Sequence, residues 1–321
     1  MVTQEIIDLI IVGGGPAGLT AGIYGMRAAL NTVIVEKGLY GGQVSKTESV
    51  ENYPGFESIT GFELCQKLHD HAKSYGMQMI QREIVSIEPG LDYHEVRLDN
   101  GDVLRGHAVI MAQGGSPRKL EVPGEDDYYG KGVSYCATCD GFFFRGKSVL
   151  VVGGGDTAME EALYLAKLCK RVYLAHRRDA FRASRILQRR VCAECKIEVL
   201  WNTVVTEIKA NDEGVCGVAL KDTQTGATRE LATDGVFVFV GFLPNNALVP
   251  AGVQMNVEGY VITDSKCETK IPGVYAVGDL REKYARQVVV AAADGCTAAL
   301  AAAHYVEAKK AQSATCVLPE E

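Results

Sequence analysis

The chain carries DLIIVGGGPAG at positions 8–18, a short apolar run that leads directly into clustered glycines. The run predicts a buried strand over 8–12, followed by a helix over 19–29 and a second strand over 32–35. Small residues in the loop let the backbone approach a pyrophosphate at the helix N-terminus, where unpaired N–H groups attract anions. The loop fits the pattern G-x-G-x-x-G through Gly13, Gly15 and Gly18, with Pro16 and Ala17 between the last two glycines.

An acidic residue strengthens this interpretation. Glu36 stands where the second strand ends, a position from which a carboxylate accepts hydrogen bonds from ribose hydroxyls. A glycine-rich tight turn without a ligand is the structural alternative, but it would not need a strand, helix, strand and terminal acid in this order. The segment therefore predicts a dinucleotide-binding βαβ unit.

The same pattern recurs in the middle of the chain. A strand is predicted over 148–152, a helix over 159–168 and a further strand over 171–175, with the glycine loop GGGDTA before the helix. The candidate contacts in this loop are Gly153, Gly155, Asp156, Thr157 and Ala158, the last at the third glycine position. The chain thus contains two dinucleotide sites.

In the second site, basic residues stand at the position that would contact the ribose. HRRDAFR at 176–182 follows the strand, where an acid would serve an unmodified ribose. Several cations suit a dianionic 2′-phosphate through charge-assisted hydrogen bonds, whereas an exposed basic patch is the alternative. The side chains expected to hold NADPH here are His176, Arg177, Arg178 and Arg182.

A close cysteine pair precedes the second nucleotide strand. Cys136 and Cys139 can close a small disulfide, and one thiolate can attack a substrate disulfide while the other resolves the mixed disulfide. Asp140 is adjacent and can supply the proton that disulfide reduction requires. Phe142 and Phe143 are candidates for docking a partner, with core packing as the alternative.

A second pair, Cys192 and Cys195, raises the alternative of a shared zinc site. The gap between the two pairs far exceeds the spacing of zinc ribbons, so we expect no metal. The second pair is interpreted as two incidental thiols near a helix end.

Two dinucleotide sites, one suited to NADPH, indicate a flavoprotein that passes a hydride from NADPH to FAD. The C-terminal third supports this, because VYAVGD at 274–279 predicts a strand that ends in Gly278 and Asp279 and brings a carboxylate to the flavin. Arg286 and Gln287 follow, and an Ala/Gly-rich helix is predicted over 288–305.

If the first and last sections both bind FAD, that domain is discontinuous. The stretches 115–124 and 241–246 are rich in glycine and proline and are candidate crossings. We therefore expect an α/β fold of two Rossmann-like, three-layer domains. The FAD-binding domain would comprise 1–116 and 247–321, and the inserted NADPH-binding domain 117–246 would carry the cysteine pair.

Composition narrows the class of protein further. The 321 residues, 47% hydrophobic and 23% charged, suit about two folded globular domains. The net charge of −7 gives no support for binding nucleic acid or an anionic membrane. The N-terminus lacks the basic segment of a signal peptide, and no run approaches about 18 uninterrupted apolar residues. We expect a cytoplasmic protein with neither a nucleic-acid nor a membrane partner.

Together these segments resemble the low-molecular-weight thioredoxin reductases, which are FAD- and NADPH-dependent disulfide reductases. The resemblance extends from about Asp8 to about Tyr305. It rests on GGGPAGL at 13–19, GGQ at 41–43, ENYPG at 51–55, CATCDGFF at 136–143, GGGDTA at 153–158, HRRDAFRA at 176–183, GD at 278–279 and RQ at 286–287.

The resemblance implies roles that the spacing alone does not give. It implies that FAD is contacted by Gln43, Asn52, Asp279 and Gln287, with Gly42, Gly278 and Arg286 in the same motifs. It implies that Cys139 faces the flavin while Cys136 attacks the disulfide of oxidised thioredoxin. Reducing equivalents would then pass from NADPH through FAD and the Cys136–Cys139 pair to the partner, and the NADPH domain would rotate between the two half-reactions. A homodimer and a separate thioredoxin partner are also implied.

One departure and three rivals accompany the resemblance. The family usually has Ala-Thr-Gly where this chain has Ala112-Gln113-Gly114, and a longer amide can keep a hydrogen bond, so FAD binding is expected to persist. A related flavin disulfide reductase serving another small redox protein is the nearest alternative. A ferredoxin–NADP reductase would lack the cysteine pair, and a redox sensor without turnover would need neither Asp140 nor the arginines.

Overall fold

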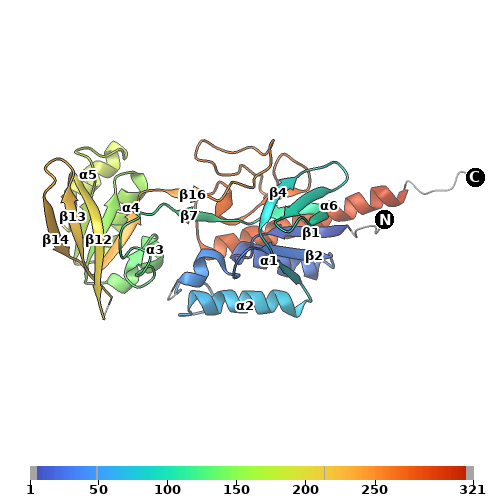
Figure 1. The fold of residues 1–321 in the computed structure, drawn as a ribbon, viewed down its shortest axis with the longest axis horizontal. Coiled ribbons are helices and arrows are strands. Elements are labelled where there is room, and N and C mark those ends of the chain that lie inside the picture. Colours follow the sequence, from blue (N-terminus) through green and yellow to red (C-terminus); the bar gives the residue numbers. More distant parts are fainter. Residues whose placement is uncertain (1–5, 48–49, 213, 316–321) are drawn as a thin grey trace, which may run out of the picture. The chain divides into compact units, whose positions relative to one another are not determined.

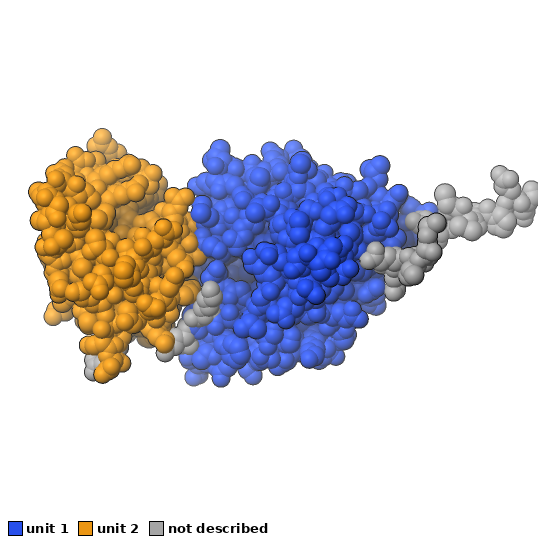
Figure 2. Space-filling model, in the orientation of Figure 1, with its two compact units in different colours: residues 1–49, 53–116, 243–321 blue, residues 50–52, 117–242 orange. Residues whose placement is uncertain are grey.

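The computed structural model describes residues 6–47, 50–212 and 214–315 and divides the chain into two compact units (Figure 2). Unit 1 comprises residues 1–49, 53–116 and 243–321, and unit 2 comprises residues 50–52 and 117–242. Two short strands, β7 (Gly115–Pro117) and β16 (Phe242–Pro244), lie where the chain leaves and re-enters unit 1, and they pair with each other. Unit 1 is therefore assembled from segments far apart in the sequence.

Unit 1 is built on a seven-stranded sheet of order β3-β2-β1-β6-β5-β4, with β17 also paired to β6 (Figure 1). The strands are β1 (Ile7–Val12), β2 (Thr32–Glu36), β3 (Gln78–Gln81), β4 (Ile84–Glu88), β5 (His94–Leu98), β6 (Val103–Met111) and β17 (Val274–Ala276). The pairs formed by β1, β2, β3, β6 and β17 are parallel, whereas β5 runs antiparallel to both β4 and β6. The helices are α1 (Pro16–Arg27), α2 (Gly61–Ser74) and α6 (Val288–Thr315), with short 3₁₀ segments η1 (Gly42–Lys46) and η3 (Gly278–Leu280).

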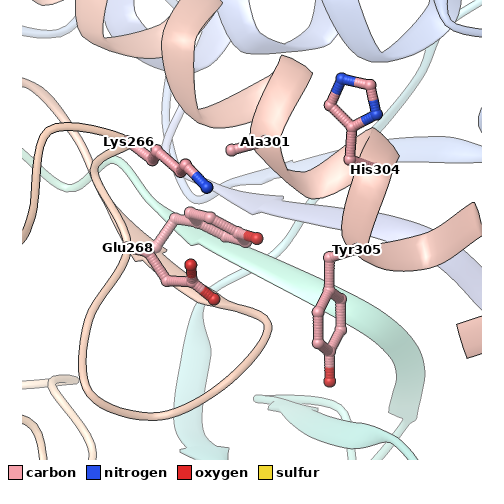
Figure 3. Close-up of a pocket in the computed structure, with 6 residues that line it drawn as sticks. Lys266, Glu268, Ala301, His304 and Tyr305 are labelled. Atoms are coloured by element: carbon pink, nitrogen blue, oxygen red, sulfur yellow. The ribbon is translucent and has the colours of Figure 1, made fainter. Parts of the chain in front are cut away.

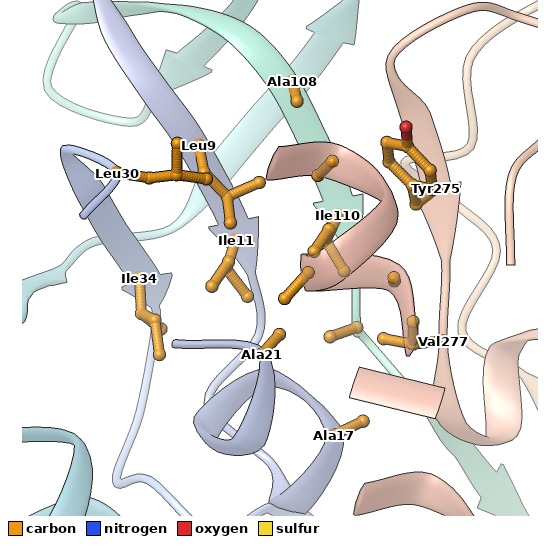
Figure 4. Packing of buried hydrophobic residues seen from close by; sticks show 14 of the residues in the cluster. Leu9, Ile11, Ala17, Ala21, Leu30, Ile34, Ala108, Ile110, Tyr275 and Val277 are labelled. Carbon is orange, nitrogen blue, oxygen red and sulfur yellow. The ribbon is translucent and has the colours of Figure 1, made fainter. Parts of the chain in front are cut away.

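Alternating side chains on β1 feed two separate core layers. Leu9 and Ile11 pack with α1 and α6 on one face, as Figure 4 shows for Ala17 and Ala21 of α1. The intervening Ile10 and Val12 pack on the other face with residues of β4 and β5. An apolar run buried on both faces is what a central parallel strand requires.

Unit 2 is built on a five-stranded parallel sheet of order β11-β10-β9-β15-β8. Its strands are β8 (Val133–Ser134), β9 (Ser148–Gly153), β10 (Arg171–Ala175), β11 (Ile197–Leu200) and β15 (Gly235–Phe239). One face packs on α4 (Asp156–Leu168) and α5 (Arg185–Ala193). The other packs on an antiparallel sheet of β12 (Thr203–Asn211), β13 (Gly214–Asp222) and β14 (Thr228–Ala232). Two short elements, α3 (Ala137–Asp140) and η2 (Gly141–Phe144), precede β9.

These observations confirm the predicted α/β class and its two Rossmann-like sheets. The third layer of unit 2 is a three-stranded sheet rather than helices. The strand predicted over 274–279 ends earlier, at Ala276, and Gly278 starts the 3₁₀ turn η3. The predicted helix over 288–305 extends to Thr315.

Helix α6 is long and apolar enough, over Val288–Gln312, to cross a membrane by length and composition. In the structure, however, Ala298, Ala302 and Val306 are fully buried in the core cluster that also contains α1. A buried face of this kind is typical of a core helix, and we interpret α6 as one.

Candidate functional site

The first glycine loop joins β1 to α1 and leaves one position open. A Cβ atom on Gly13 would lie 2.6 Å from the Ala112 carbonyl oxygen, and one on Gly18 would lie 1.9 Å from the Gly13 oxygen. Gly15 differs, because no described atom lies within 4 Å of a Cβ built there. The first and third glycines thus allow close packing of strand, loop and helix, while the second faces free space at the start of α1. Pro16 and Ala17 are buried in the first turn of the helix. This is the arrangement that a dinucleotide-binding loop needs.

Glu36 is fixed beside this loop at the end of β2. Its carboxylate accepts hydrogen bonds from the N–H of Gly14 at 2.7 Å and of Gly38 at 3.0 Å. Gly42 also borders the open position, since a Cβ there would stand 3.5 Å from the Gly15 Cα. The structure therefore brings Glu36 and Gly42 to the first loop.

The C-terminal turn meets the same helix. A Cβ on Gly278 would lie 3.2 Å from the Ala17 Cβ, so η3 adjoins the start of α1. Asp279 Oδ1 is buried, lies 3.4 Å from Lys283 Nζ, and has no hydrogen-bond partner among the described residues. Burial raises the pKa of Asp279, and the neighbouring Lys283 opposes the rise. A buried carboxylate oxygen that is ion-paired with Lys283 but not hydrogen-bonded, in a turn that adjoins the start of α1, fits a polar ligand such as the ribityl hydroxyls of FAD.

Sequence reasoning missed the residue that holds this turn. Asp294 on α6 is buried and accepts hydrogen bonds from the Gly278 N–H at 3.1 Å, from Arg281 at 2.9 Å and from Lys283 at 3.1 Å. A single acid within the Ala-rich stretch 291–295 was the available signal.

Four further residues predicted to contact FAD lie outside the first glycine loop and the Asp279 turn. Gln43 is exposed, with its Nε2 3.5 Å from Ser116 Oγ, and Asn52 belongs to the short segment grouped with unit 2. The Arg286 guanidinium lies 4.3 Å from the centre of the Tyr260 ring. Gln287 directly precedes α6, and its carbonyl oxygen accepts from the Ala291 N–H at 2.9 Å.

The second glycine loop, in unit 2, repeats the geometry of the first. A Cβ on Gly153 would lie 2.5 Å from the Ala158 Cβ, whereas Gly155 has no described atom within 4 Å of such a Cβ. Asp156 begins α4, and its Oδ1 accepts a hydrogen bond from the Ser184 N–H at 2.6 Å. Thr157 is exposed in the first turn. The helix N-terminus is thus open to an anion.

In the basic segment after β10, one side chain is buried and supports the loop, whereas the arginines are exposed. His176 is buried, and its ring nitrogens lie 3.1 Å from the Gly153 oxygen and 3.0 Å from the Ala180 oxygen. Because both nitrogens face backbone carbonyls, His176 holds the loop rather than offering a group to a phosphate. The side chains available to a 2′-phosphate are those of the exposed residues Arg177, Arg178 and Arg182.

Cys136 and Cys139 form a disulfide at the start of α3, with their Cα atoms 5.3 Å apart. The Cys139 N–H donates to Cys136 Sγ at 3.2 Å. Ser134 Oγ accepts from the Cys136 N–H at 3.0 Å and donates to Asp140 Oδ2 at 2.5 Å. Ser134 therefore connects the disulfide segment to the acid.

Burial raises the pKa values of two acids beside the disulfide. Burial raises the pKa of Asp140, and the hydrogen bond from Ser134 opposes that rise. Burial also raises the pKa of Glu161 on α4, opposed by hydrogen bonds from the backbone of Ala137 and Thr138. A carboxyl group that retains a proton near a disulfide can act as a general acid.

The surface next to the pair is apolar. Phe142 and Phe143 are exposed, which favours the docking interpretation over core packing, and the Arg145 guanidinium lies 5.5 Å from the centre of the Phe142 ring. Cys192 and Cys195 are free and exposed. In the ranges that the structure describes, no group of three or more His, Cys, Asp or Glu side chains is placed to hold a metal ion.

A hollow of about 260 Å³ lies in unit 1 beside α6 (Figure 3). It is lined by Lys266, Glu268, Tyr275, Ala301, His304 and Tyr305. None of these residues belongs to either glycine loop, so the hollow is separate from the predicted cofactor positions.

Comparison with known proteins agrees with the geometry. Residues 7–295 match the family model of the pyridine nucleotide-disulphide oxidoreductases. The chain is 46% identical to a thioredoxin reductase of Bacillus subtilis, covering 96% of this chain and 97% of the relative. It is 42% identical to one of Helicobacter pylori, covering 94% and 99%.

Among solved structures, the thioredoxin reductase of Streptococcus pyogenes superposes with a TM-score of 0.92 at 42% identity, covering 95% of this chain and 100% of that one. The resemblance inferred from the motifs is confirmed. The chain therefore belongs to the pyridine nucleotide-disulphide oxidoreductase family.

Proposed function

We propose that this protein is an NADPH-dependent thioredoxin reductase that uses FAD and the Cys136–Cys139 pair. The observation that carries the proposal is the disulfide itself, set beside the half-buried acid Asp140 in the unit that also holds the second glycine loop. The names of the relatives and the exposed arginines support thioredoxin and NADPH as the two substrates.

Each of the two glycine loops would bind a different cofactor. FAD would be held in unit 1 by the loop around Gly15, by Glu36 and by the Asp279 turn; NADPH would be held in unit 2 at Gly155 and the exposed arginines. Bound FAD would supply the two-electron relay between the nicotinamide and the disulfide. Because Gly155 and the disulfide lie on the same inserted unit, both must reach the flavin in turn, and a rotation of unit 2 about its two connections would achieve this.

The cysteine chemistry then follows from the local contacts. The Cys136 thiolate attacks one sulfur of the partner disulfide, which forms a mixed disulfide and releases a thiolate that takes a proton. Cys139 attacks Cys136 and releases the second partner thiol, which restores the disulfide. Asp140, whose pKa is raised by burial and which lies next to Cys139 in sequence, would supply the proton for this step. One NADPH and one proton are consumed for each partner disulfide reduced.

The exposed Phe142 and Phe143 offer an apolar contact for the partner beside Cys136. A separate thioredoxin, a homodimeric assembly and a cytoplasmic location complete the proposal, as the resemblance implies.

An absorbance spectrum followed by an NADPH oxidation assay tests the proposal. A yellow protein whose NADPH use depends on oxidised thioredoxin, with a disulfide dye as final acceptor, is the expected result. A yellow protein that oxidises NADPH but ignores every thioredoxin would instead point to a different small redox partner. A colourless protein that binds no flavin would refute the proposal.

A further inference from the structure

Lys283 lies inside unit 1 between two acids that come from different elements. Its Nζ is 3.4 Å from Asp279 Oδ1 in the turn η3, and it donates a hydrogen bond to Asp294 Oδ2 on α6 at 3.1 Å. The exposed fraction is only 7% for the Lys283 side chain and 10% for that of Asp294. A buried ammonium group that contacts two carboxylates has exchanged its hydration shell for them, so the charges of the three groups depend on one another.

Asp294 has partners besides Lys283. It accepts hydrogen bonds from the Gly278 N–H at 3.1 Å and from Arg281 Nη1 at 2.9 Å. Removal of the lysine would therefore leave Asp294 with a cationic partner and a backbone donor. For Asp279, by contrast, Lys283 is the cation that contacts the carboxyl group on its buried side.

The two oxygens of the Asp279 carboxyl group have different surroundings. Oδ1, the atom next to Lys283, is inaccessible, yet 31% of the Asp279 side chain is exposed. The exposed part of the side chain thus lies away from Oδ1, on the side of Oδ2. Since a Cβ on Gly278 would lie 3.2 Å from the Ala17 Cβ, the turn also adjoins the start of α1. Lys283 therefore holds one oxygen on the buried side, while the other side of the carboxyl group is accessible to a ligand.

Burial works against a charged Asp279. It raises the pKa of this carboxyl group, and the adjacent Lys283 is the largest influence that lowers the pKa. The other charged groups that face Asp279 are Arg286, which also lowers its pKa, and Asp294, which raises it. Tyr260, whose ring centre lies 4.3 Å from the Arg286 guanidinium, is a further titratable neighbour. Without Lys283, burial and the charge of Asp294 would favour a protonated Asp279.

We infer that Lys283 is a positioning residue for the flavin dinucleotide, because it keeps the Asp279 carboxylate charged and directed toward the cofactor. The inference rests on the proposed function, which makes FAD the ligand of this turn. A charged carboxylate accepts stronger hydrogen bonds from hydroxyl groups than a neutral carboxyl group does. Lys283 thus increases the affinity for FAD through Asp279, and Asp294 holds Lys283 in place.

The decisive variant is Lys283→Met, which keeps most of the length of the side chain and removes its charge. FAD is stripped from the protein and titrated back between about pH 6 and pH 9 while its fluorescence is followed. We expect wild type to bind FAD with a nearly constant dissociation constant over this range. In Lys283→Met the constant should be about tenfold or more higher at the acidic end, the typical loss of a hydrogen bond to a charged group. It should recover toward wild type as the pH rises, because Asp279 then loses its proton.

Asp294→Asn distinguishes the charge of Asp279 from the packing of the cluster. Asparagine keeps an oxygen for the Gly278 N–H, and Lys283 then pairs with Asp279 alone. The thermal midpoint of the flavin-free protein should fall, because one member of a buried charge cluster is lost. The affinity of this variant for FAD should nevertheless stay independent of pH. Lys270→Met, at an exposed position in the same unit, is the matched control and should change neither quantity.

Three results would overturn the inference alone. One is an FAD affinity of Lys283→Met within about twofold of wild type at every pH. Another is an affinity weakened equally at every pH, which would assign the lysine to packing. The third is a pH-dependent affinity in Asp294→Asn, since that variant keeps the pair of Lys283 and Asp279.

Failure of the proposed function is distinguishable from these results, because wild-type protein would then bind no FAD at any pH. If Lys283→Met does not fold, Lys283→Gln keeps a hydrogen-bond donor without the charge. FAD binding by Lys283→Gln that strengthens with rising pH supports the inference, and binding that is independent of pH contradicts it.

Discussion

Ser134 Oγ donates a 2.5 Å hydrogen bond to Asp140 Oδ2 and accepts one from the Cys136 N–H. A single hydroxyl therefore connects the redox pair to the acid that we assign to proton transfer. This contact stabilises the charged carboxylate, whereas burial stabilises the neutral carboxyl, and burial has the larger effect on the pKa of Asp140.

Removing the hydroxyl should change the pH dependence of turnover. Ser134→Ala deletes the interaction that lowers the Asp140 pKa, so the pKa should rise further and the protonated acid should persist to higher pH. The descending limb of the pH profile for disulfide reduction should move to higher pH relative to wild type. A limb that stays in place, or moves to lower pH, would show that Asp140 does not govern it.

Removing the acid should slow only the disulfide half of the reaction. Asp140→Asn is expected to lower thioredoxin turnover by about 100-fold or more, a typical loss for a general acid. Reduction of the flavin by NADPH, followed by rapid mixing, should stay near the wild-type rate. Asp127→Asn, at an exposed position nearby in sequence, is the control. Equal slowing of both half-reactions by Asp140→Asn would contradict the assignment.

Replacing one cysteine of the pair should likewise affect only the disulfide half of the reaction. Cys139→Ser should retain FAD and its reduction by NADPH but abolish disulfide turnover, because the remaining thiol cannot re-form the internal disulfide. Stopped-flow spectra and the thioredoxin assay measure the two steps. Substantial residual turnover of thioredoxin would refute the role of Cys139.

The exposed arginines should set the preference for NADPH. Neutralising Arg177, Arg178 and Arg182 together should raise KM for NADPH far more than for NADH, by about tenfold or more in the ratio, since only NADPH carries the 2′-phosphate. Steady-state kinetics with both nucleotides gives the ratio. Neutralising Arg189 and Arg190, which are exposed on α5, serves as the control. An unchanged ratio in the triple variant would remove these arginines from the phosphate site.

A buried histidine should destabilise unit 1 in acid. Burial, aided by the charge on Lys309, lowers the pKa of His94 to about 4, and the Gly90 N–H donates to its Nδ1 at 3.3 Å. The unfolded chain binds a proton near the ordinary histidine value of about 6.5, so stability is lost as pH falls from there toward 4. We expect a contribution of about 2 kcal/mol to that loss by pH 5.

Urea unfolding at pH 7 and pH 5, in saturating FAD, measures this effect. His94→Gln should reduce the difference between the two pH values, whereas His304→Gln, at an exposed position, should leave it unchanged. An equal difference in wild type and His94→Gln would show that His94 does not contribute.

Much of the site follows from local sequence because its determinants are local. The loops around Gly13 and Gly153 combine a buried strand, small residues and a helix start, and these occupy consecutive positions. The cysteine pair and Asp140 are likewise adjacent. Such features need no knowledge of distant contacts.

Other features depend on residues far apart in the chain. His176 stands among arginines and was expected to join them at the phosphate, but its ring packs against Gly154, Phe181 and Trp201. Asp294 on α6 accepts a hydrogen bond from the Gly278 N–H, although the two residues belong to different elements. The three-stranded layer of unit 2 has alternating polar residues, and its position is decided by packing of Ile208 and Leu220 on the parallel sheet.

Strand β6 pairs with strands from distant parts of the sequence, and this pairing affects how the chain can fold during translation. The first half of β6 pairs with β5, but its second half receives β17, and α6 closes the core only at the end of the sequence. On a translating ribosome the inserted segment 117–242 has all its strands before β17 emerges. Unit 1 therefore begins to emerge first but is completed last. Until the last quarter of the chain has been translated, its nascent sheet leaves one edge of β6 unpaired.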